Sequence, residues 1–191
     1  MYHIKNDQRS IRSGQLLYEA LATLMQEKPF HSITVTDLVK TAQVGRTTYY
    51  RNFDEMEDIL WLRCDQTFDA FLAYVKTYMQ QQPTESRTAL LKPLLRFFYQ
   101  NSEIIELLIR ANRLDIIQGS FWARLQPFRE QIAVLHGVAE IYADYSLAIR
   151  IGVMTNILVH WTKTGKQQAP DQLAETLEVM MNQMITLEQM F

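Results

Sequence analysis

The chain has 191 residues, of which 48% are hydrophobic and 21% are charged, and this composition excludes an intrinsically disordered protein. The formal net charge of −2 is too close to zero to indicate a class of partner. A single cysteine, Cys64, excludes an internal disulfide and a cysteine-rich metal site.

No apolar run of the sequence approaches the roughly 18–20 residues that are needed to span a bilayer. Residues 1–7 also lack the apolar stretch of a secretory signal. We therefore expect a cytoplasmic protein without a membrane partner. The six glycines and five prolines cluster near the ends of the expected helices, which favours an all-α fold.

The first predicted helix runs from about residue 7 to residue 27. Its apolar residues recur at steps of three and four, which is typical of an amphipathic helix: Ile11, Leu16, Leu17, Ala20, Leu21, Leu24 and Met25. Pro29 ends this helix, and a second one is expected over residues 34–42. Thr34 is its expected N-cap, and Asp37 three residues later forms a variant of the capping box.

A bend at residues 43–45 separates the second helix from a third, whose side chains are suited to contact phosphates and base edges. Two short helices joined by such a turn form a helix-turn-helix, in which the second helix enters the DNA major groove. Residues 1–52 carry seven basic and four acidic side chains, whereas the remainder carries twelve basic and seventeen acidic ones. A basic head agrees with DNA contact, although small charge asymmetries between segments also arise by chance.

Residues 55–81 are predicted to form one long helix of about 40 Å, because each helical residue adds about 1.5 Å. A single apolar stripe runs along it: Trp61, Cys64, Phe68, Phe71, Val75 and Tyr78. Cys64 lies in this stripe, so we interpret it as a core residue. The long helix divides the chain into a head, residues 1–54, and a C-terminal helical domain for regulation and dimerisation, residues 55–191.

Further helices are expected over residues 86–100, 102–117, 121–135 and 141–163, with breaks at residues 101–102, 119–120 and 137, and a last one opens at Pro170. The helix over 141–163 has two apolar stripes, one with Ile149, Val153 and Ile157 and the other with Leu147, Ile151, Met154, Leu158 and Trp161. The last helix repeats Leu173, Leu177, Met180, Met184 and Leu187. These residues form either an ordinary core or, as we expect, the interface of a homodimer.

Residues 34–60 resemble the characteristic helix-turn-helix stretch of the TetR family of bacterial transcriptional regulators. The resemblance combines the helix spacing, the position of the turn and a Thr-aromatic-Tyr-x-x-Phe signature, here residues 48–53. It is strong over about residues 8–62 and extends to the C-terminal half only as a pattern of helices. It implies an all-α fold, in which a long helix joins a three-helix head to a C-terminal domain for ligand binding and dimerisation.

Carried over position by position, the resemblance assigns DNA contacts to Val35, Thr36, Gly45, Arg46, Thr47, Thr48, Tyr50, Arg51 and Asn52. Arg46 is the candidate reader of guanine O6 and N7, and Asn52 is expected on a phosphate or an adenine edge. Tyr49 and Phe53 correspond to core aromatic residues.

Three residues depart from the family pattern. Gln43 replaces a turn glycine, so a residue with a side chain is expected to adopt positive φ at a cost of about 1 kcal/mol. Gly45 replaces the usual Ser or Thr N-cap. Met56 replaces a lysine that reaches DNA, which predicts weaker phosphate binding.

Family members usually bind a small ligand among their C-terminal helices. The candidate pocket residues here are Phe68, Phe71, Phe97, Phe98, Phe121, Trp122 and Tyr142, with Arg110 or Arg113 as polar anchors. Aromatic residues at helical spacing also serve as plain core, and the abundance of rings favours a lipophilic or aromatic ligand.

The expected function is therefore that of a homodimeric transcriptional regulator, a repressor that binds a near-palindromic double-stranded operator and is released by a ligand. The alternative is a co-activator or protein-interaction adapter with weak DNA binding. We expect neither a cofactor nor an enzyme, because the four histidines lack metal-ligand spacing and no nucleophile motif or phosphate loop occurs.

Overall fold

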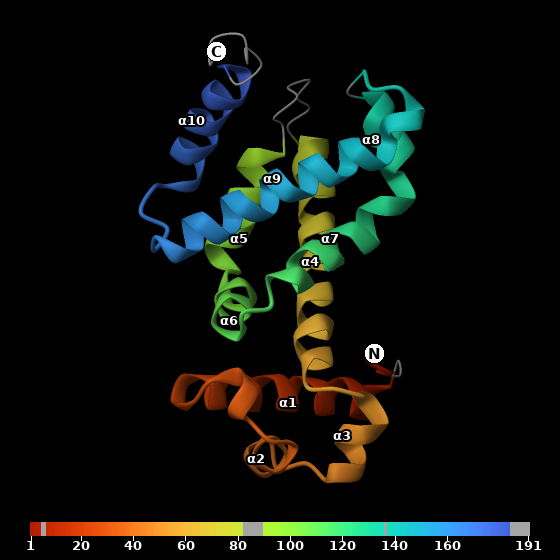
Figure 1. The fold of residues 1–191 in the computed structure, drawn as a ribbon, viewed down its shortest axis with the longest axis vertical. Helices are drawn as coiled ribbons and strands as arrows, with labels where there is room; N and C mark the ends of the chain where they lie inside the picture. The colour runs from red at the N-terminus through yellow and green to blue at the C-terminus, as the bar shows by residue number, and fades with distance from the viewer. Residues whose placement is uncertain (5–6, 82–89, 136, 184–191) are drawn as a thin grey trace. The chain divides into compact units, whose positions relative to one another are not determined.

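The computed structural model describes residues 1–4, 7–81, 90–135 and 137–183 (Figure 1). These residues form only helices, apart from one isolated antiparallel bridge between Tyr2 and Phe53, which confirms the all-α prediction. The α-helices are α1 Gln8–Glu27, α2 Val35–Thr41, α3 Arg46–Asn52, α4 Glu57–Gln81, α5 Leu91–Gln100, α6 Glu103–Ala111, α7 Leu114–Leu125, α8 Arg129–Leu135, α9 Ala143–Lys163 and α10 Pro170–Gln183. Three short 3-10 helices are η1 Phe30–Ser32, η2 Gln126–Phe128 and η3 Glu140–Tyr142.

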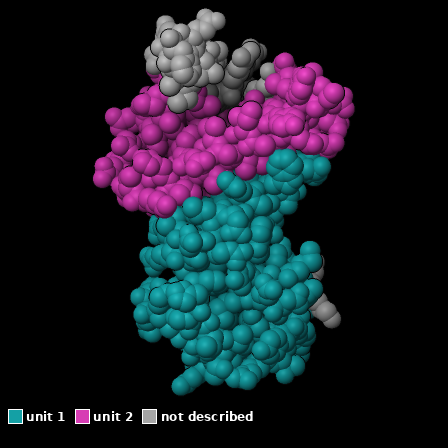
Figure 2. All heavy atoms as spheres, viewed as in Figure 1, with its two compact units in different colours: residues 1–68, 103–127 teal, residues 69–102, 128–191 magenta. Residues whose placement is uncertain are grey.

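The chain divides into two compact units (Figure 2). The first combines residues 1–68 with residues 103–127, and the second combines residues 69–102 with residues 128–191. The first unit therefore adds α6, α7 and the start of α4 to the three helices of the head. Within the described residues, we find no helix of the length and apolarity that a membrane crossing requires.

Within the first unit, the core of the head is built from the apolar faces of α1, α2 and α3. Leu17 and Leu21 of α1 and Leu38 of α2 are fully buried, as α1's periodicity predicts. Tyr49 and Phe53 are buried beside them with their ring centroids 6.1 Å apart, which confirms their structural role. This core fixes the position from which α3 presents its other face to solvent.

The predicted boundaries of the helices over 102–117 and 121–135 are wrong. The first is broken at Asn112, whose φ of 54° ends α6 before α7 begins. The second is interrupted by η2, which contains Pro127, a residue without an N–H to continue the helical hydrogen bonds. The expected break at Gly119 and Ser120 is absent, since both residues lie inside α7.

In the second unit, α10 packs on α5 and α8 packs on α9. Arg96 of α5 forms a bidentate ion pair with Asp171 of α10, through Nε–Oδ1 and Nη2–Oδ2 contacts of 2.6 and 2.7 Å. This hydrogen-bonded pair holds the pKa of the Asp171 carboxyl below its usual range. The apolar core of the unit includes residues of α5 and α9: Leu94, Leu95, Leu147, Ile151, Leu158 and Trp161.

Candidate DNA-binding head

The start of α2 is fixed by the predicted capping box. The Asp37 backbone N–H donates to Thr34 Oγ1 at 3.2 Å, and the Thr34 N–H donates back to Asp37 Oδ2 at 3.0 Å. Lys28 Nζ lies 2.6 Å from the same carboxylate oxygen. The Lys28 ammonium and then the Thr34 donors hold the pKa of Asp37 well below its usual range.

The turn between α2 and α3 contains the strained residue that the sequence predicts. Gln43 has a φ of 54°, in the left-handed region where a glycine would be unstrained. The turn is closed by the Val44 N–H, which donates to the Val39 carbonyl at 3.1 Å. Gly45 is the N-cap of α3 and has no side chain that could cap the helix. The first backbone N–H groups of α3 therefore have no side-chain acceptor at the N-cap.

The solvent face of α3 carries four of the predicted contact residues. Arg46, Thr47, Tyr50 and Arg51 are exposed, and they fall within one arc of the helix because each residue advances about 100°. Tyr50 is 60% exposed although it is a large aromatic residue. On α2, Thr36 is exposed and Val35 is half-buried, and Thr48 of α3 is also half-buried.

Asn52 requires a correction. Its side chain is only 1% exposed, because it lies on the face of α3 that packs on α1. Ser10 Oγ donates to Asn52 Oδ1 at 2.7 Å, and Asn52 Nδ2 donates to the Thr48 carbonyl at 3.0 Å. The amide is therefore used inside the head, and we leave Asn52 out of the proposed DNA contacts.

No sequence pattern predicts a polar cluster that also belongs to the first unit. Tyr2, Asp65, Ser120 and Arg124 form it, and we name these four residues the Asp65 junction. Burial first, and the hydrogen bond to Asp65 second, raise the pKa of Tyr2 to about 12, so its hydroxyl stays a donor at neutral pH. Only the fold brings these residues together, since Tyr2 and Asp65 are 63 positions apart.

The nine residues expected around a ligand fall in both units. Phe68 and Phe121 pack together in the first, with ring centroids 3.9 Å apart, and Phe71 packs on Phe97 and Phe98 in the second, at 5.5 Å each. Arg113 Nη1 is paired with Glu57 Oε1 at 3.0 Å. Arg110, Trp122 and Tyr142 are exposed.

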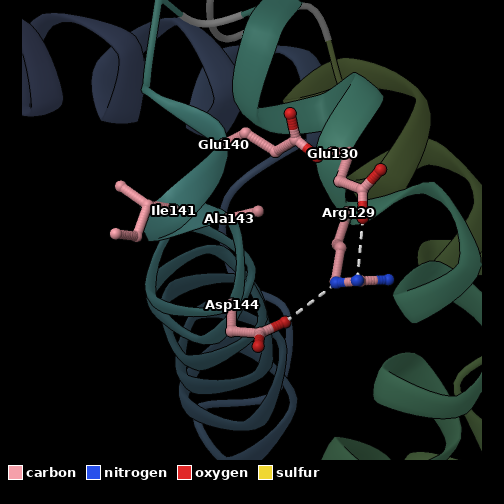
Figure 3. Close-up of a pocket in the computed structure, with 6 residues that line it drawn as sticks. All are labelled: Arg129, Glu130, Glu140, Ile141, Ala143 and Asp144. Carbon is pink, nitrogen blue, oxygen red and sulfur yellow. Dashed lines mark ion pairs between the residues drawn. The ribbon is translucent and has the colours of Figure 1, made fainter.

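A surface hollow of about 400 Å³ lies in the second unit (Figure 3). Its lining is largely polar: Arg129, Glu130, Glu140, Ile141, Ala143 and Asp144. Arg129 is ion-paired there with Glu130 at 2.8 Å and with Asp144 at 3.2 Å. None of the nine candidate ligand residues lines this hollow, and its charged lining does not suit a lipophilic ligand.

The predicted dimer residues also require a correction. Leu147, Ile151, Leu158 and Trp161 are buried in the second unit's own core, so this stripe of α9 is not available to a second subunit. Of the other apolar stripe of α9, Ile149 and Val153 are exposed and Ile157 is half-buried, and Tyr145 is exposed one turn before Ile149. Of the remaining candidates, Met154, Leu173 and Leu177 are half-buried, Met180 is exposed, and Met184 and Leu187 lie outside the described residues.

The chain is similar to curated helix-turn-helix regulators. Over 58 residues, 30% of this chain, it is 34% identical to DhaS of Lactococcus lactis, an HTH-type transcriptional activator of the dhaKLM operon. Over 175 residues, 88% of this chain, it is 24% identical to the uncharacterised HTH-type transcriptional regulator YxbF of Bacillus subtilis. These matches span only 31% and 44% of the respective relatives. No protein-family model matches the chain.

The fold as a whole is similar to that of Lin0861 from Listeria innocua, a protein of known crystal structure. The TM-score is 0.77 at 18% sequence identity, and the match covers 95% of this chain and 96% of that one. At this identity the likeness concerns the fold alone. The comparisons thus relate the chain to helix-turn-helix transcriptional regulators.

Proposed function

We propose that this protein is a TetR-like transcriptional regulator that binds a near-palindromic double-stranded operator as a homodimer. The observation that carries the proposal is the solvent face of α3, on which Arg46, Thr47, Tyr50 and Arg51 stand beside a helix-turn-helix turn. The similarity to helix-turn-helix regulators supports it independently of the geometry.

In the proposed complex, α3 enters the major groove and Arg46 donates to O6 and N7 of a guanine. Thr47, Tyr50 and Arg51 contact the backbone, and Val35 and Thr36 direct the first amides of α2 at a phosphate. Tyr49 and Asn52 stay in the head and hold α3 on α1. Two such heads, about 34–36 Å apart, would read successive major grooves.

The proposed dimer interface is the exposed apolar stripe of α9. Tyr145 is 72% and Ile149 is 67% exposed, which is unfavourable for a lone protomer. Gly152 lies in the same region of α9, and a Cβ built on it would meet no atom within 4 Å. A mid-helix glycine costs about 1 kcal/mol relative to alanine, and the close approach of a second α9 would explain its presence. Met180, exposed on α10, is the remaining candidate.

We further propose that a small lipophilic or aromatic molecule regulates DNA binding. For the direction of regulation, the first candidate is repression, in which the bound protein occupies the promoter. The second candidate is activation, which the similarity to the activator DhaS favours. A promoter-reporter fusion distinguishes them, because deletion of the regulator raises expression in the first case and lowers it in the second.

The test is a selection of duplex fragments by the purified protein, followed by an anisotropy titration of the selected site. We expect a near-palindrome and a loss of affinity in Arg46→Ala, whereas Lys163→Ala, an exposed cation on α9, serves as the matched control. Failure to enrich any sequence, or equal affinity in wild type and Arg46→Ala, would overturn the assigned recognition helix. A salt titration distinguishes this function from that of a protein-interaction adapter with weak DNA binding. The DNA affinity of a DNA-directed regulator falls steeply between low and moderate salt.

A further inference from the structure

Asp65 of α4 receives three hydrogen bonds from two other parts of the first unit. Its Oδ2 accepts from the Tyr2 hydroxyl at 2.6 Å, and its Oδ1 accepts from Ser120 Oγ at 2.6 Å and from Arg124 Nη1 at 2.7 Å. The Asp65 side chain is only 15% exposed and that of Arg124 only 17%. In such a site, charge-assisted hydrogen bonds are strong and the loss of any one donor is costly.

Tyr2 connects this junction to the end of the recognition helix. It forms an antiparallel bridge with Phe53, the C-cap residue of α3. The next residue, His3, donates its backbone N–H to the Asn52 carbonyl at 2.7 Å. That carbonyl belongs to the last turn of α3, where helix carbonyls lack partners within the helix. The N-terminal segment therefore holds the C-terminal end of α3.

The other two donors lie one helical turn apart on α7, which contacts α4 through individual side chains. Ser120 is fully buried, and the adjacent Phe121 packs on Phe68 of α4. At Gly119, a Cβ would lie 2.3 Å from Trp61 Cη2, so any larger residue requires the Trp61 ring to move or the two helices to separate. A displacement of α7 on α4 would consequently carry two of the three donors away from Asp65.

We propose that Tyr2 and Asp65 are positioning residues that couple the recognition helix α3 to α7, so that loosening of α7 lowers sequence-specific DNA affinity. The inference rests on the proposed function, because α3 reads DNA only there. The path is continuous and lies within one compact unit: α7, Asp65, Tyr2, and the last turn of α3. Tyr2, Asp65, Ser120 and Arg124 lie outside the solvent face of α3, so we expect their effect on DNA to pass through the position of that helix.

The first variant is Tyr2→Phe, which removes one hydroxyl and keeps the ring. We expect the ratio of specific to non-specific DNA affinity to fall about tenfold, as for one hydrogen bond to a charged group. Simple destabilisation of the fold would instead lower the specific and the non-specific affinity by the same factor. Ser120→Ala should act in the same direction, and the double variant should lose less than the product of the two single losses, since both act on Asp65. Tyr99→Phe, an exposed tyrosine of the second unit, is the matched control.

Amide hydrogen exchange of the free protein provides a readout that needs no DNA. In Tyr2→Phe, the His3 amide and the last turn of α3 should exchange faster than in wild type. If the wild type selects no DNA, the proposed function fails while this exchange experiment still reports on the junction. Unchanged exchange of these amides in Tyr2→Phe overturns the inference. Faster exchange also overturns it if the ratio of specific to non-specific DNA affinity is unaltered. The same holds if the loss in the double variant equals the product of the two single losses.

Discussion

Arg46 Nη2 donates a hydrogen bond to Thr36 Oγ1 at 2.5 Å, so the first residue of the recognition helix is held by the first turn of α2. A guanidinium has five N–H donors in a rigid plane, and this contact uses one of them. The remaining donors are available for a base edge. Thr36 thus orients the residue on which the proposed sequence readout depends.

We therefore predict that Thr36→Val weakens recognition through Arg46 without removing the charge. Valine keeps the shape of threonine and removes the acceptor, so discrimination at the base pair that Arg46 reads should fall by about 1 kcal/mol, less than the roughly 1–3 kcal/mol expected for Arg46→Ala. Anisotropy titrations against single-base-pair variants of the selected site measure both. If Thr36→Val and wild type discriminate equally at this base pair, the Arg46–Thr36 hydrogen bond does not contribute to base readout.

A second prediction concerns Asn52, which sequence reasoning assigned to DNA and the structure places in the core of the head. Asn52→Ala removes two hydrogen bonds and should lower the free energy of unfolding by about 1–3 kcal/mol. The slope of log K against log salt should stay unchanged. Arg51→Ala, the neighbouring exposed cation, is the matched contrast, with little change in stability and a slope reduced by about one unit. A loss of discrimination at a single A·T pair of the selected site in Asn52→Ala, measured against single-base-pair variants, would restore its DNA contact.

The head was the most predictable part of the chain because its signals are local. Thr34 and Asp37 are three residues apart, and a capping box depends on nothing else. Gln43 was expected at positive φ from its position in the turn alone, and its φ is 54°. For Asn52 the same reasoning failed, because the helical phase that decides burial depends on how α1 packs against α3.

What the sequence could not predict depends on contacts between distant positions. The sequence predicts a helix break at Gly119, but the reason for a glycine there is the ring of Trp61 on another helix. Tyr2 and Asp65 have no shared periodicity or motif, and only the fold brings them together. The two apolar stripes of α9 were recognised, yet which of them faces the core was decided by tertiary packing and was predicted wrongly.

The exposed stripe of α9 leads to a third prediction. Ile149→Glu should weaken the proposed homodimer by about 2 kcal/mol or more, because the substitution buries an unpaired carboxylate in an apolar interface. The isolated protomer should keep its stability, since Ile149 is exposed in it. Sedimentation velocity over a concentration series measures the dissociation constant. Gln118→Glu on α7 is the charge-matched control, and an undiminished dimer in Ile149→Glu would exclude this face as the interface.

A fourth prediction is the acid sensitivity of the contact between α5 and α10. Because Arg96 lowers the pKa of Asp171, the carboxylate contributes stability above its unfolded pKa of about 3.9 and loses it as the pH falls through the folded value. Both side chains are more than one-third exposed, so Asp171→Asn should cost at most about 1 kcal/mol at neutral pH. Urea titrations should show this difference at pH ~7 and its progressive loss as the pH falls below ~3.9. A difference that persists in acid would assign the loss to packing rather than to charge.

The last prediction tests why α7 carries a glycine in its interior. Gly119→Ala would normally favour a helix, yet its Cβ would lie 2.3 Å from Trp61 Cη2 and 2.9 Å from Cζ3. The indole must move or α7 must lift from α4, so we expect a loss of about 1–3 kcal/mol in the free energy of unfolding. Trp61→Phe shortens the ring, and Gly119→Ala should cost less in that background than in wild type. Equal costs in the two backgrounds, measured by urea denaturation, would show that the Trp61 ring does not require the glycine. At Gly152, where a Cβ meets no atom within 4 Å, the same substitution should not destabilise the isolated protomer.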